Sequence, residues 1–173
     1  MTMDLTRREM ILAGAAAALA GGCLAAGTED AMDAAQSELR ARLESQSEAM
    51  ETKDIERLMS FYSPDVVYFD VVPPLQFAGA AALRGRFLQW FDTWKGPIGM
   101  ETRDLQLAVS GDLAVAHWFN RASGTLKSGQ QVGSWVRVTN CWQRSDRTWL
   151  ITHEHVSWPA DPKSGSAAKD LAP

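Results

Sequence analysis

Four side chains of this sequence could exchange protons at neutral pH. Asp70 ends a run of β-branched and aromatic residues, and His117, His153 and His155 are the three histidines of the chain. A carboxyl placed against aromatic walls has a raised pKa, and histidine titrates near neutral pH. Asp70 and His155 are therefore our candidate catalytic acid–base pair, on the condition that the fold brings their strands together. The alternatives are an aspartate that only ends a strand and histidines that only make structural hydrogen bonds.

Aromatic and polar residues elsewhere in the chain could form the walls of a ligand pocket. The chain holds seven tryptophans, and a pocket lined by two or three of them would favour a flat or apolar ligand. The alternative is that they only fill the core, as most large aromatic residues do. The ligand-binding candidates are Tyr62, Trp90, His117, Trp118, Asn140 and Glu154.

The alternation of side chains along a strand constrains these candidates. His153 and His155 project from one face of their strand and Glu154 from the other, because successive residues point to opposite faces. The same rule puts either Arg137 or Asn140 toward a cavity, but it does not say which face is inside. Three histidines could hold a metal ion, but their spacing is not that of a known site, and we predict no metal.

The apolar patterns predict the elements that must position these residues. Helical spacing predicts helices at residues 28–50, from residue 53 to the proline at position 64, and at 79–94. Strand signals separated by turn residues follow. We therefore expect an α+β fold with three N-terminal helices packed on a curved, mostly antiparallel six-stranded sheet. The predicted strands are 66–72, 75–78, 100–109, 113–125, 131–144 and 148–158.

The N-terminus has the pattern of an export signal. Residues 6–12 contain the pair Arg7-Arg8 and resemble a twin-arginine motif, and the apolar stretch at 11–20 is too short to span a bilayer. Cleavage near Ala26 would release a periplasmic protein, whereas lipidation of Cys23 would leave a membrane anchor. We expect a signal peptide at 1–27, a functional domain at 28–160 and a disordered tail at 161–173.

Composition excludes some classes of function. The net charge of −4 and the lack of a basic run after Arg8 argue against a nucleic-acid partner. Removal of Cys23 with the leader would leave Cys141 as the one thiol, which cannot close an internal disulfide. The sequence has no glycine-rich nucleotide loop and no cysteine cluster, so we predict no cofactor.

Three segments resemble a known family. Residues 53–70 resemble the opening of the nuclear transport factor 2-like superfamily, and residues 110–114 and 149–157 resemble its SnoaL-like branch. Similar endings occur in the association domain of calcium/calmodulin-dependent kinase. The resemblance covers residues 33–159 and implies three helices that cap a conical six-stranded barrel with a deep pocket, often paired into homodimers.

Ketosteroid isomerases belong to the same superfamily, and the resemblance implies roles for some residues. Asp70 stands where those enzymes have their general base. Their oxyanion hole needs a tyrosine and a carboxylic acid, where this chain has Gln46 (or a neighbour) and Asn140. These departures argue against steroid isomerase activity and leave a general polar pocket.

Three functional hypotheses follow. The first is a binding module for a small apolar or aromatic ligand outside the cytoplasm. The second is an isomerase, cyclase or dehydratase that moves a proton on a small carbonyl compound. The third is a dimerisation domain whose pocket has no role.

Overall fold

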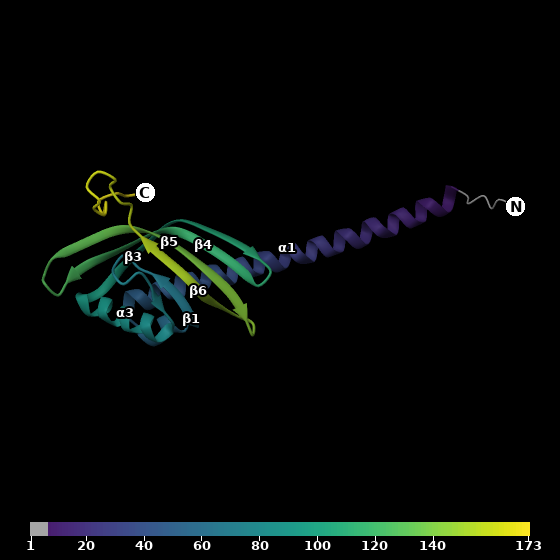
Figure 1. Cartoon of the computed structure of the whole chain (residues 1–173). Helices are drawn as coiled ribbons and strands as arrows, with labels where there is room; N and C mark the ends of the chain where they lie inside the picture. The colour runs from purple at the N-terminus through teal and green to yellow at the C-terminus, as the bar shows by residue number, and fades with distance from the viewer. Residues whose placement is uncertain (1–6) are drawn as a thin grey trace.

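The computed structural model describes the backbone of residues 7–173 and the side chains of residues 30–173. It has three helices and six strands within that range (Figure 1). The predicted leader at 1–27, including Arg7, Arg8 and Cys23, lies outside the residues whose side chains are described. Within the described part of the chain, no helix combines the length and apolar character needed to cross a membrane.

Helix α1 (Arg7–Thr52) is longer than the predicted helix at 28–50. In its second half the buried residues recur every three or four positions, at Ala35, Leu39, Leu43, Gln46 and Ala49. This spacing gives one apolar stripe, and the stripe packs against β3 (Trp94–Ser110). The polar exception, Gln46, is 1% exposed.

Helix α2 (Ile55–Met59) is much shorter than predicted. Asp54 caps it, since its Oδ1 accepts a hydrogen bond of 3.0 Å from the backbone N–H of Arg57. The prediction that the helix continues to the proline at position 64 was wrong. Tyr62 and Pro64 lie in β1 (Tyr62–Phe69), because Tyr62 pairs with β6 (Thr148–Ser157) instead of continuing the helix.

Helix α3 (Ala80–Thr93) comes after β1 and the short β2 (Phe77–Ala78), so the three helices are not all N-terminal as expected. Gly79 precedes the helix at φ 81°, a conformation that L side chains rarely adopt. Its N–H donates to the carbonyl of Val66 at 2.7 Å, which ties the start of α3 to β1. Leu83, Phe87 and Phe91 form the buried face of the helix.

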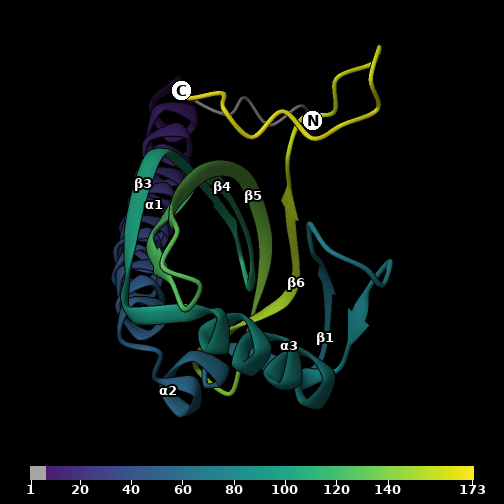
Figure 2. The same cartoon turned by 90° about the vertical axis from the view of Figure 1, so that its left-hand side faces the viewer.

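The sheet is mixed and open. Its strand order is β2-β1-β6-β5-β4-β3, where β4 is Leu113–Leu126 and β5 is Gln131–Ser145. All neighbours are antiparallel except β1 and β6, which are parallel. The predicted barrel is therefore not closed, because the edge strands β2 and β3 do not pair. Figure 2 shows the sheet curling into a trough, with α1 along β3 and α3 across one end.

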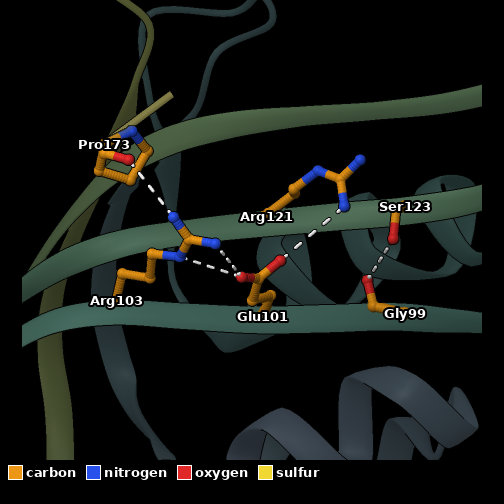
Figure 3. Close-up of polar contacts among 6 residues, drawn as sticks. All are labelled: Gly99, Glu101, Arg103, Arg121, Ser123 and Pro173. Atoms are coloured by element: carbon orange, nitrogen blue, oxygen red, sulfur yellow. Dashed lines mark hydrogen bonds and ion pairs between the residues drawn. The ribbon is translucent and has the colours of Figure 1, made fainter. Parts of the chain in front are cut away.

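The chain after β6 makes a compact turn. Ala160 and Ala167 form a bridge, and the N–H of Ala168 donates to the carbonyl of Pro159 at 2.8 Å. Further on, the carbonyl of Pro173 accepts a hydrogen bond of 3.3 Å from Nη1 of Arg103 on the outer face of β3 (Figure 3). This C-terminal segment, residues 158–173, lies beyond the arrowhead of β6 in Figure 2.

Candidate functional site

A cavity of about 670 Å³ lies inside the trough, a volume typical of small-molecule sites. Its walls come from the concave face of β4, β5 and β6, from α3, and from the end of β1. Alternate residues of β5 line the cavity from Val132 through Ser134 and Val136 to Val138, and Gln131 and Gly133 at the start of the strand also contribute. Aromatic rings dominate the remaining wall: Tyr68, Phe87, Trp90, Trp94, Trp118 and Trp158.

Glu154 is the one buried carboxyl of β6 in this wall. It lines the cavity and is 4% exposed. Burial raises the pKa of Glu154 from 4.5 to about 7, against the opposing effect of the hydrogen bond from Tyr62 and of the neighbouring amides of Gln46 and Asn140. The carboxyl is therefore close to half protonated at neutral pH and can both accept and donate a proton.

Tyr62 holds Glu154 from behind the wall. Its hydroxyl donates to Oε2 of Glu154 at 3.3 Å and accepts a hydrogen bond of 2.9 Å from Nε2 of Gln46. Because Gln46 occupies an acceptor site of the hydroxyl, the tyrosine proton is free to point at Glu154. Burial, followed by the nearby charge of Glu154, raises the pKa of Tyr62 well above its usual value, so the phenol stays protonated as a donor.

Asn140 stands opposite Glu154 in the β5–β6 ladder and is fully buried. Its Oδ1 accepts a hydrogen bond of 2.7 Å from the indole N–H of Trp142, which directs the amide Nδ2 away from Trp142. Nδ2 makes no hydrogen bond of normal geometry with the described residues, and the nearby amide lowers the pKa of Glu154. The unpaired N–H is a buried donor that the carboxylate form of Glu154 can use.

Asp70 and Arg86 form an ion pair at the end of β1. Nε of Arg86 lies 2.6 Å from Oδ2 of Asp70, and the side chains are 15% and 6% exposed, respectively. Oδ1 of Asp70 accepts a second hydrogen bond of 2.6 Å from the backbone N–H of Val71. Both residues line the cavity, but their charges cancel each other.

Comparison with known proteins identifies the family. Residues 39–161 match the model of the SnoaL-like domain. The chain belongs to the SnoaL-like domain family. No curated protein matches it.

Solved structures agree with the SnoaL-like assignment. An NTF2-like protein of unknown function from Pseudomonas putida KT2440 is 33% identical, with a TM-score of 0.75 over 82% of this chain and 98% of that one. The association domain of C. elegans CaMKII is 15% identical, with a TM-score of 0.60 over 74% of this chain and 98% of that one. A ketosteroid isomerase-like protein from Erwinia carotovora atroseptica is 19% identical, with a TM-score of 0.59 over 68% and 91% of the two chains. The last two show the fold alone.

The structure separates the predicted site residues of this SnoaL-like domain into three groups. Asp70, Trp90, Trp118 and Glu154 line the cavity. Tyr62 and Asn140 lie behind its wall and act on Glu154 rather than on a ligand directly. His117 and His155 lie outside the cavity.

The expected pairing of Asp70 with His155 does not occur in the structure. Glu154 takes the inward position on β6, so the alternation of the strand turns His155 outward, where it packs against the ring of Phe69 at 5.7 Å. Asp70 is paired with Arg86 instead. His117 is exposed on the same outer face, and His153 binds the carbonyl of Val67 through Nδ1 at 2.8 Å.

Sequence reasoning did not select three residues of the site. Gln46 was noted only as a departure from the isomerase pattern, and a buried polar residue inside an apolar helical stripe is the signal that could have selected it. Arg86 and Lys169 carried no signal, since each is one cation among many in the sequence. Among residues 30–173, no three His, Cys, Asp or Glu side chains gather in a way that could hold a metal ion.

Proposed function

We propose that this protein binds a small, largely apolar or aromatic molecule in the cavity between α3 and the sheet. The observation that carries the proposal is the wall itself: six aromatic rings line a cavity of about 670 Å³ that also holds the buried carboxyl of Glu154. Such a combination buries most of a flat ligand and orients it through one or two hydrogen bonds. Trp90 and Trp118 are the ligand contacts we expect to matter most.

Native mass spectrometry of the purified full chain tests this proposal. A bound small molecule that is retained under mild conditions and lost on denaturation would support it. A preparation that carries no ligand and that also fails to bind small aromatic probes such as biphenyl-4-carboxamide would contradict it.

A second candidate function is proton transfer on a small carbonyl compound, as in an isomerase, cyclase or dehydratase. It is favoured by Glu154, whose pKa of about 7 suits a group that alternately takes up and releases a proton. Glu154 is a better candidate base than Asp70, because Arg86 and the Val71 N–H already occupy both oxygens of Asp70. His155 would take no direct part.

An exchange experiment tests the catalytic function. The methyl protons of 4-acetylbiphenyl in D2O, followed by NMR, should exchange faster with the protein than without it. Glu154→Gln should abolish the acceleration and Asp70→Asn should retain most of it. Equal exchange with and without protein would remove this candidate.

We also propose that the chain pairs into a homodimer through the outer face of the sheet. Phe69, Leu113 and Val115 are exposed apolar residues of β1 and β4, and such residues favour burial against a second copy. Val115→Lys should convert a dimer to a monomer in light scattering. Leu88→Lys, at an exposed apolar position on α3, is the matched control and should leave the dimer intact.

We also propose export by the twin-arginine route. The exported protein is either free in the periplasm or attached to the membrane by a lipid at Cys23. This part of the proposal rests on the sequence pattern at residues 1–27. Replacement of Arg7 and Arg8 by lysine should retain the protein in the cytoplasm in cell fractionation. Cys23→Ala distinguishes the two fates, since it should release the protein from membranes only if Cys23 is lipidated.

A further inference from the structure

The charges around the cavity are distributed unevenly. Its charged lining residues are Asp70, Arg86, Glu154 and Lys169. The first two form an ion pair and contribute no net charge. The remaining two differ in depth, because Glu154 is buried at 4% exposure and Lys169 is exposed. The cavity therefore has an acidic interior and a cationic rim.

Lys169 has no carboxylate partner within the described part of the chain. Its ammonium nitrogen lies over the ring of Trp158, 4.3 Å from the centroid. A cation–π contact orients the ammonium group but leaves its positive charge uncompensated. The indole N–H of Trp158 is also buried and makes no hydrogen bond with the described residues. The rim thus presents one positive charge, that of Lys169, which no carboxylate of the described residues offsets.

The C-terminal segment holds Lys169 in this place from both sides. Before it, the N–H of Ala168 donates to the carbonyl of Pro159. After it, the carbonyl of Pro173 accepts from Arg103, whose guanidinium is itself fixed by Glu101 at 2.8 Å (Figure 3). These contacts hold the backbone on both sides of Lys169, and the contact with Trp158 orients its ammonium group.

The spacing of residues along β6 gives the length of a ligand that could contact both Glu154 inside the cavity and Lys169 at its rim. Glu154, Val156 and Trp158 line the cavity in alternation. Four residues of extended strand span about 13 Å, and the wall of β5 facing them is formed mainly by valines. An apolar body of two rings would fit between the deep carboxyl and the rim.

We propose that the cavity takes an elongated aromatic monocarboxylate, which enters with its apolar end first and keeps its carboxylate at the rim beside Lys169. This inference rests on the proposed ligand-binding function and names the ligand class. The reverse orientation would place the ligand carboxylate beside Glu154, and two carboxylates cannot both stay ionised in one poorly hydrated site without repelling each other. At the rim, the carboxylate stays partly hydrated and gains the uncompensated charge of Lys169.

A matched pair of probes tests the orientation. Biphenyl-4-carboxylate and biphenyl-4-carboxamide have nearly the same shape and differ in charge. Their affinities for the full chain are measured by isothermal titration at pH 7. We expect the carboxylate to bind up to about fivefold more tightly than the carboxamide, the range of a partly exposed ion pair, with a preference that falls as salt increases.

Variants of two lysines in the same segment complete the test. Lys169→Gln should bring the two affinities together, Lys169→Arg should retain the preference, and Lys163→Gln, at an exposed position that does not line the cavity, should change nothing. Binding of both probes with a preference that survives Lys169→Gln would overturn this inference alone. Equal losses in Lys169→Gln and Lys163→Gln would also overturn it, since they would indicate a general charge effect. If neither probe binds, the proposed function fails as well.

Discussion

The hydroxyl of Tyr62 lies 3.3 Å from Oε2 of Glu154, although the two residues are 92 positions apart in the sequence. The parallel pairing of β1 with β6 brings them together, with Gln46 of α1 completing the arrangement from the other side. This contact opposes the effect of burial on the pKa of Glu154, because it favours the carboxylate form.

Stability should fall as the pH rises through the titration of Glu154. The folded pKa of about 7 exceeds the unfolded value of 4.5, so the folded state holds a proton that the unfolded state has lost between these pH values. The contribution of this bound proton to the free energy of unfolding is complete below pH 4.5 and lost above pH 7. Glu154→Gln removes the ionisation and should be more stable than the parent at pH 8 by about 3 kcal/mol, with little difference at pH 4.5. Urea unfolding of both proteins at pH 8 and pH 4.5 measures the difference in their free energies of unfolding. An equal difference at the two pH values would contradict the prediction.

Tyr62→Phe should raise the pKa of Glu154 further. The variant loses the donor that favours the carboxylate form, and burial then acts with less opposition. Carbon NMR of the labelled Glu154 carboxyl reports the midpoint of its titration directly. Tyr68→Phe is the control, because the hydroxyl of Tyr68 makes no hydrogen bond with residues 30–173. A midpoint that moves equally in both variants would show that the hydrogen bond from Tyr62 has no specific effect.

Arg86→Met should destabilise the protein by about 3 kcal/mol, because it leaves Asp70 buried without its partner. The double variant Arg86→Met with Asp70→Asn should recover much of the loss. Arg84→Met is the comparison, since Arg84 pairs with Glu56 on the surface and such a pair contributes under about 1 kcal/mol. Denaturant unfolding of the four proteins checks the order, and a small loss for Arg86→Met would mean that Asp70 remains well hydrated.

Trp118→Ala should weaken binding of biphenyl-4-carboxamide by about tenfold, the effect of losing one aromatic contact of about 1.4 kcal/mol. Trp135→Ala should leave the affinity unchanged, because Trp135 does not line the cavity and contacts Arg103 instead, with 4.8 Å between guanidinium and ring. Titration of each folded variant with the probe gives the comparison. Equal affinities for Trp118→Ala and the parent would place the ligand elsewhere.

The sequence alone determined most of the local elements, the α+β class and the SnoaL-like resemblance. Turn residues and apolar periods predicted β4, β5, β6 and α3 to within about two residues, because these patterns express local backbone preferences. The strand period also showed that Glu154 and His155 face opposite ways. It could not show which of them faces the cavity.

The tertiary structure decided that question and the partners of each charge. Glu154 is inside because α1 and α3 cover the concave face of the sheet, and a strand has no sequence signal for the face that a distant helix will cover. The replacement of the expected Asp70–His155 pair by Asp70–Arg86 has the same origin. The strand pairing of Tyr62 with β6 likewise depends on a contact between segments far apart in the chain. Periodicity limits each side chain to one of two faces, and only packing between elements selects the buried one.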